Sequence, residues 1–131
     1  MLTLATRAVP ARAESHFDHD EVHIATLHGL LESGFALTDR RLVAWRTNGV
    51  SGPLPLAAID RILVDTGAGS SHVDILVLPR YAVHAPLVLT LRVNHVDRAM
   101  DFVECLIDAS GAQPTRERWG PVFRASFPTP A

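Results

Sequence analysis

The apolar residues of this chain change their spacing once, near residue 94, and this change constrains the fold more than any other feature. Before it, short runs of alternating or β-branched residues are separated by turn residues. After it, apolar residues recur at the spacing of one helical face: Val96, Ala99, Met100, Val103, Leu106 and Ile107. The sequence therefore predicts several antiparallel strands followed by one amphipathic helix, from about His95 to Ala109.

Seven strands are expected before this helix. They are Glu21–Leu31, Phe35–Thr38, Arg41–Arg46, Pro53–Leu56, Ile59–Thr66, Val73–Leu78 and Leu87–Val93. Asn48-Gly49 suits a hairpin turn, and the prolines of the fourth run favour the edge of a sheet. The pattern predicts a bent antiparallel sheet or partly open barrel with the helix at its open end. A helix lying across a flat sheet fits the same pattern.

Two motifs resemble a known family. The segment Gly34-Phe35-Ala36-Leu37-Thr38-Asp39-Arg40-Arg41-Leu42-Val43 resembles bacterial pleckstrin-homology-like (PH-like) domains, in which a Gly-led strand ends in Leu-Thr-Asp-Arg-Arg-Leu. The segment Pro53-Leu54-Pro55-Leu56-Ala57-Ala58-Ile59 is similar to the family's I-P-L-x-x-I element. The resemblance covers roughly residues 21 to 110. It implies a mainly β, PH-like fold of about seven strands capped by the helix, and it makes homo-oligomers an expectation.

The length supports one domain with flanking segments. A chain of 131 residues has enough apolar material for one core and is too short for two ordinary domains. We expect a loosely ordered leader over residues 1–20, the PH-like domain over 21–111, and a tail rich in proline, aromatic residues and arginine over 112–131.

Composition excludes some partners. The net charge is −2 and the pI is about 6.4, so no bulk positive field draws the chain onto nucleic acid. No apolar run approaches the roughly 18 residues of a membrane span. The single cysteine, Cys105, fits a reducing cytoplasm and falls on the polar arc of the helix, where a half-exposed thiol is expected. We expect a soluble, cytoplasmic protein.

The tail carries the first group of candidate binding residues. Aromatic residues alternate there with arginines and prolines, and such residues are costly to expose and common in protein interfaces. Packing back onto the same chain is the alternative. The candidates for a protein partner or for self-association are Trp119, Phe123, Phe127, Arg116, Arg118 and Arg124.

A lipid-binding alternative rests on Arg40, Arg41 and Arg46. Basic residues bind anionic head groups in lipid-binding relatives of the family, which place several of them around the first hairpin loop. Here that loop is the acidic Glu32-Ser33-Gly34, so a structural role for the arginines competes with membrane binding. A membrane surface is therefore a possible partner that the sequence does not favour.

A metal-binding alternative rests on His16, His19 and His23, which have ligand types and spacings suited to Zn²⁺. The competing interpretation is a solvated leader. The Gly67–Ser71 segment has glycines like a phosphate-binding loop, yet a strand rather than a helix follows it, which favours a hairpin loop.

The sequence contains no nucleophile elbow and no Cys with a positioned His. It therefore predicts a non-catalytic interaction or scaffold domain without a cofactor. A small enzyme built on the histidines is the remaining alternative.

Overall fold

A computed structural model of the chain describes residues 9–65, 71–110, 115–119 and 122–126. Its helices are α1 (Ala11–Glu14) and α2 (Val96–Ser110), with short 3-10 turns η2 (Leu56–Ala58) and η3 (Val93–His95). Its strands are β1 (His23–His28), β2 (Gly34–Thr38), β3 (Arg41–Arg46), β4 (Gly49–Pro55), β5 (Ile59–Asp65), β6 (His72–Pro79), β7 (Leu87–Arg92), β8 (Thr115–Trp119) and β9 (Val122–Ser126). All seven expected strands and the expected helix form.

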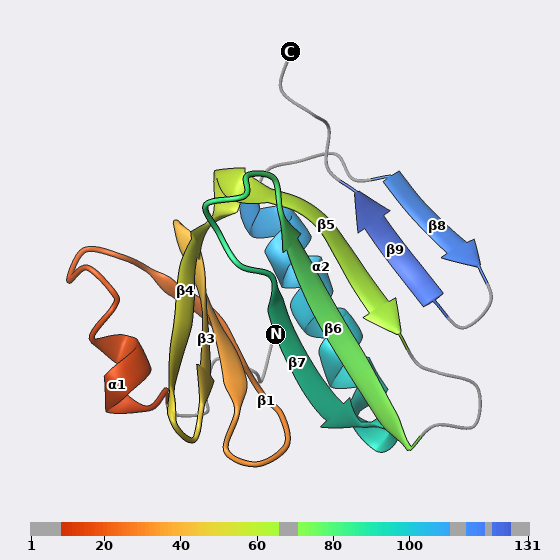
Figure 1. Cartoon of the computed structure of the whole chain (residues 1–131), viewed down its shortest axis with the longest axis horizontal. Helices are drawn as coiled ribbons and strands as arrows, with labels where there is room; N and C mark the ends of the chain where they lie inside the picture. The colour runs from red at the N-terminus through yellow and green to blue at the C-terminus, as the bar shows by residue number, and fades with distance from the viewer. Residues whose placement is uncertain (1–8, 66–70, 111–114, 120–121, 127–131) are drawn as a thin grey trace.

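The strands build two antiparallel sheets (Figure 1). The first sheet has the order β1-β2-β3-β4, and the second has the order β7-β6-β5-β9-β8. A two-residue turn at Thr47–Asn48 joins β3 to β4, close to the predicted Asn-Gly turn. Strand β4 lies at an edge, as its prolines predicted, because proline cannot donate to a second neighbour.

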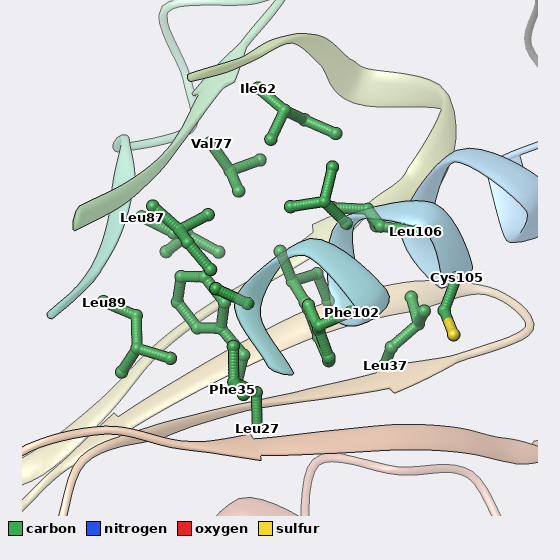
Figure 2. Close-up of a cluster of buried hydrophobic side chains, with 14 of the residues drawn as sticks. Leu27, Phe35, Leu37, Ile62, Val77, Leu87, Leu89, Phe102, Cys105 and Leu106 are labelled. Carbon is green, nitrogen blue, oxygen red and sulfur yellow. The ribbon is translucent and has the colours of Figure 1, made fainter. Parts of the chain in front are cut away.

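Helix α2 fills the space between the sheets. Figure 2 shows Leu27 and Phe35 from the first sheet on one side of the helix, and Ile62 and Val77 from the second sheet on the other. The Phe35 and Phe102 rings lie 6.0 Å apart between centroids. Because both sheets supply apolar side chains, the helix and the two sheets enclose one continuous core.

The contact with two sheets corrects the prediction for Cys105. A helix that packs on one surface buries one stripe, but α2 also buries Phe102 and Cys105 beside the predicted stripe. Cys105 is 7% exposed and belongs to the core (Figure 2). Burial raises the pKa of its thiol, and the nearby carboxylates of the helix, led by Asp108, act in the same direction.

The described part of the tail packs back onto the same chain, the alternative that the sequence left open. Residues 115–119 and 122–126 form a hairpin, and its strand β9 pairs antiparallel with β5 (Figure 1). Proline does prevent one continuous helix there, as expected, but the segment is part of the second sheet. The remaining fold prediction is confirmed: the protein is mainly β, with two bent antiparallel sheets and one long helix in a PH-like arrangement.

Candidate interaction site

The turn between β2 and β3 is held by the side chain of Thr38. Its oxygen accepts hydrogen bonds from the backbone N–H groups of Arg40 and Arg41, both at 3.1 Å. The hydroxyl donates to Glu21 Oε2 at 2.5 Å. Thr38 is fully buried, and a buried hydroxyl needs such partners. The Thr-Asp-Arg-Arg segment is therefore a structural turn.

Both arginines of this turn pair with carboxylates of the leader. Arg40 forms a two-pronged pair with Asp20, at 3.0 and 3.2 Å. Arg41 lies 3.2 Å from Asp18 and 3.1 Å from Glu21, whose side chain is only 1% exposed. The Arg40 hydrogen bond holds the pKa of Asp20 below its ordinary value. We call this group the leader corner: Asp18, Asp20, Glu21, Thr38, Arg40 and Arg41.

The rest of the described leader covers the outer face of the first sheet. Ala13 is fully buried there against Ala36, Val43 and Trp45, and Phe17 packs against the same cluster. Arg12 Nη2 donates to the backbone oxygen of Arg46 at 2.8 Å. Residues 9–20, expected to be loosely ordered, thus dock on the sheet through apolar and polar contacts.

The three arginines of the lipid-binding alternative do not gather at one place. Arg40 and Arg41 lie at the start of β3, whereas Arg46 ends this strand, about 17 Å away at roughly 3.3 Å per residue. The first two are neutralised by the leader. Arg46 lines a surface hollow together with residues of the β1–β2 and β3–β4 turns.

The histidines of the metal-binding alternative do not converge either. His16, His19 and His23 are all exposed, and His23 Nε2 lies 2.6 Å from Thr26 Oγ1. No group of three His, Cys, Asp or Glu residues in the described part of the chain is placed to hold a metal ion. The acidic residues between these histidines serve the leader corner instead.

The partner-binding candidates of the tail lie on the β8–β9 hairpin, except Phe127, which falls outside the described residues. The backbone of Phe123 pairs with Val64 of β5, and the backbone of Arg124 pairs with Leu63. Arg116, Arg118 and Trp119 lie on β8, the outermost strand of the second sheet. The Gly67–Ser71 loop also falls outside the described residues, apart from Ser71.

The turn between β1 and β2 was predicted at Glu32-Ser33-Gly34 but is centred on Leu31 and Glu32, and sequence reasoning missed the exposure of Leu31. Leu31 and Glu32 both have positive φ, 54° and 59°, and Ser33 N–H donates to the Leu30 oxygen at 3.1 Å. Such two-residue turns favour Asn and Gly because a Cβ is strained in this conformation. Leu31 is nevertheless 87% exposed at the tip. We call residues 30–33 the Leu31 turn.

Two surface hollows flank the Leu31 turn, each with a volume of about 650 Å³. The first lies between this turn, the β3–β4 turn with Arg46, and Val88 of β7. The second lies between the same turn, Arg92 and the exposed Val93. The Leu30 N–H donates to the Thr90 oxygen at 2.9 Å, which fixes the turn against β7.

The position of this turn depends on a glycine. A Cβ on Gly29 would lie 2.6 Å from both the Thr90 oxygen and Leu89 Cδ1, so only glycine allows the end of β1 to approach β7 this closely. A leucine pair next to a Gly, followed by Glu-Ser-Gly, was the available sequence signal. It indicated a loop without revealing that Leu31 faces solvent.

Comparison with protein-family models, with curated proteins and with solved structures finds no match to this chain. Neither helix among the described residues is long and apolar enough to cross a membrane.

Proposed function

We propose that this chain is a non-catalytic interaction domain of the bacterial PH-like family, acting in the cytoplasm through contacts with a protein partner. The observation that carries the proposal is the Leu31 turn. A leucine that is 87% exposed in a strained conformation, set between two hollows, costs stability in the isolated chain. Such a cost is expected where a partner covers the side chain.

The chemistry of the hollows supports binding rather than catalysis. Their ionisable lining residues are Arg46, Arg92 and His72. No carboxylate or thiol is among the described lining residues, and Ser71 Oγ lies 3.3 Å from His72 Nδ1, where it adds a hydrogen-bonding hydroxyl to the surface. Hydroxyl, amide and guanidinium groups next to aliphatic side chains are typical of a recognition surface.

Self-association is the second way in which the domain can act. The β8 strand leaves its outer backbone edge without a neighbouring strand among the described residues, and open edges pair readily with other strands. The proposal therefore includes a second copy of the chain as one possible protein partner.

Photo-crosslinking in cells expressing the full chain tests this function. A benzophenone amino acid replaces Leu31 in one variant and Val83 in a control, because Val83 is exposed to a similar extent, 83%, in the β6–β7 loop. We expect a discrete crosslinked protein from position 31 and none from position 83. A crosslink at the mass of two chains would identify self-association. No crosslink from position 31, or equal crosslinking from both positions, would contradict the proposal.

A further inference from the structure

Each hollow beside the Leu31 turn combines an apolar wall with an arginine that forms no ion pair among the described residues. Leu30 and Leu31 are shared by both hollows, and Val88 and Val93 complete the apolar lining. Arg46 lies in the first hollow and Arg92 in the second. Neither guanidinium forms an ion pair within the described part of the chain, whereas Arg40 and Arg41 do.

A further cation lies next to the first hollow. The Arg12 guanidinium donates to the backbone oxygen of Arg46, so docking of the leader brings a second positive charge to this end of β3. The leader therefore places carboxylates beside Arg40 and Arg41 at the start of β3. It also places Arg12 beside the last residue of this strand. Two arginines and no carboxylate are among the described residues that line the hollows, and Glu32 lies beside them at the turn, so the lining is positively charged although the chain as a whole carries −2.

We propose that the two hollows bind an extended segment of a protein partner in which apolar side chains are flanked by carboxylates on both sides. This inference rests on the proposed function and adds the chemical class of the partner. The apolar side chains would cover Leu31, Val88 and Val93, and the carboxylates would reach Arg46 and Arg92.

The arrangement along β7 indicates an extended ligand. Val88 belongs to the first hollow and Arg92 to the second, and they lie on one strand about 13 Å apart, at roughly 3.3 Å per residue. An extended peptide covers this distance with four or five residues, while a compact small molecule would fill one hollow only. The segment must cross the Leu31 turn, which explains why this leucine is exposed.

The charge of the tip favours a protein over a membrane. Glu32 is exposed beside Leu31 at the same turn. On insertion of Leu31 into an anionic bilayer, this carboxylate would be held against the negative surface. A peptide can place its own carboxylates at the arginines and leave Glu32 in water.

Selection from a random peptide library displayed on phage, with the full-length protein as the target, tests the inference. We expect the selected peptides to be enriched in Asp and Glu on both sides of apolar residues. Their affinity should fall by about tenfold or more in Arg46→Glu, in Arg92→Glu and in Leu31→Asn. Arg98→Glu is the control, because Arg98 is exposed on α2 and the substitution changes the net charge equally.

Each other result has a defined meaning. No selected binder, peptides without acidic enrichment, or binding that is equal in the Arg98→Glu and Arg46→Glu variants would overturn the inference. The crosslink from position 31 would still stand, so the proposed function can survive this failure. Flotation with phosphatidylserine vesicles that is lost in Leu31→Asn would assign the site to membranes and would also overturn it.

Discussion

The two ends of strand β3 carry the same residue type in opposite surroundings. At its start, Arg41 is 23% exposed and contacts Asp18 and the buried Glu21. At its end, Arg46 is exposed beside a hollow and forms no ion pair with the described residues. Arg41 thus stabilises the fold, whereas Arg46 faces the surface. The difference arises because the leader and the adjoining Glu21 supply carboxylates only at the start of the strand.

The energetic consequences of this division differ. A buried carboxylate such as Glu21 is costly to leave without its cation. An exposed arginine contributes little to the free energy of unfolding, so its loss should lower only the affinity for a ligand. Matched substitutions of the arginines at the two ends of β3 test this difference in stability.

The largest expected effect comes from removing Arg41, the cation that contacts the buried Glu21 carboxylate. Arg41→Met leaves the Glu21 carboxylate buried with fewer partners, and we expect a loss of about 3 kcal/mol in the free energy of unfolding. Arg46→Met should change it by less than about 0.5 kcal/mol. Urea denaturation measures both. Equal losses in the two variants would remove the contrast.

The next effect concerns two glycines at the hollow end of the first sheet, Gly34 on β2 and Gly49 on β4. A Cβ on Gly34 would lie 2.2 Å from Cζ2 of the buried Trp45. We therefore expect Gly34→Ala to cost about 2 kcal/mol. A Cβ on Gly49 meets no atom within 4 Å, so Gly49→Ala should be close to neutral. Thermal unfolding monitored by circular dichroism would show whether the packing around the two glycines differs.

A smaller effect of opposite sign is expected at the Leu31 turn. Leu31→Asn/Glu32→Gly supplies the residues that positive φ favours, and we expect a gain of about 1 kcal/mol in stability. The same variant should lose the crosslinked partner in a pull-down, because Leu31 is gone. A double variant that is less stable than the original chain would show that the turn is not strained.

The smallest effect is the pH dependence of the exposed pair between Asp20 and Arg40. The pKa of Asp20 is lowered in the folded chain, so its contribution is fully present above its ordinary value of 3.8. The contribution is lost as the pH falls through the lowered pKa, because the protonated group no longer accepts the bond from Arg40. Asp20→Asn should lower the urea midpoint slightly at pH 7 and have less effect near pH 2. An identical difference at both values would contradict this assignment.

The sequence predicted the parts of the fold that depend on local patterns. The strand Arg41–Arg46 has its predicted bounds, and α2 begins and ends within one residue of its prediction. Side-chain burial was harder to predict. Cys105 looked half-exposed because a helical stripe assumes one packing surface, and α2 has two.

The candidate site was outside the reach of pattern reasoning for a physical reason. Arg40 and Arg41 are distinguished from Arg46 by carboxylates about twenty residues upstream in the chain. His16 and His19 looked like metal ligands, since spacing alone does not show that the carboxylates between and after them face Arg40 and Arg41. The exposure of Leu31 depends likewise on the contact of the β1 end with β7.

The hairpin position also affects the order in which this sheet can be completed. Strand β5 ends at Asp65, but the neighbour on its outer side, β9, begins only at Val122. During synthesis the backbone edge of β5 is therefore left open while β6, β7 and α2 emerge from the ribosome. A nascent chain in this state exposes a strand edge of Ile62, Leu63 and Val64, which can pair with another chain. Pairing with β9 covers this backbone edge and so prevents β5 from pairing with another chain.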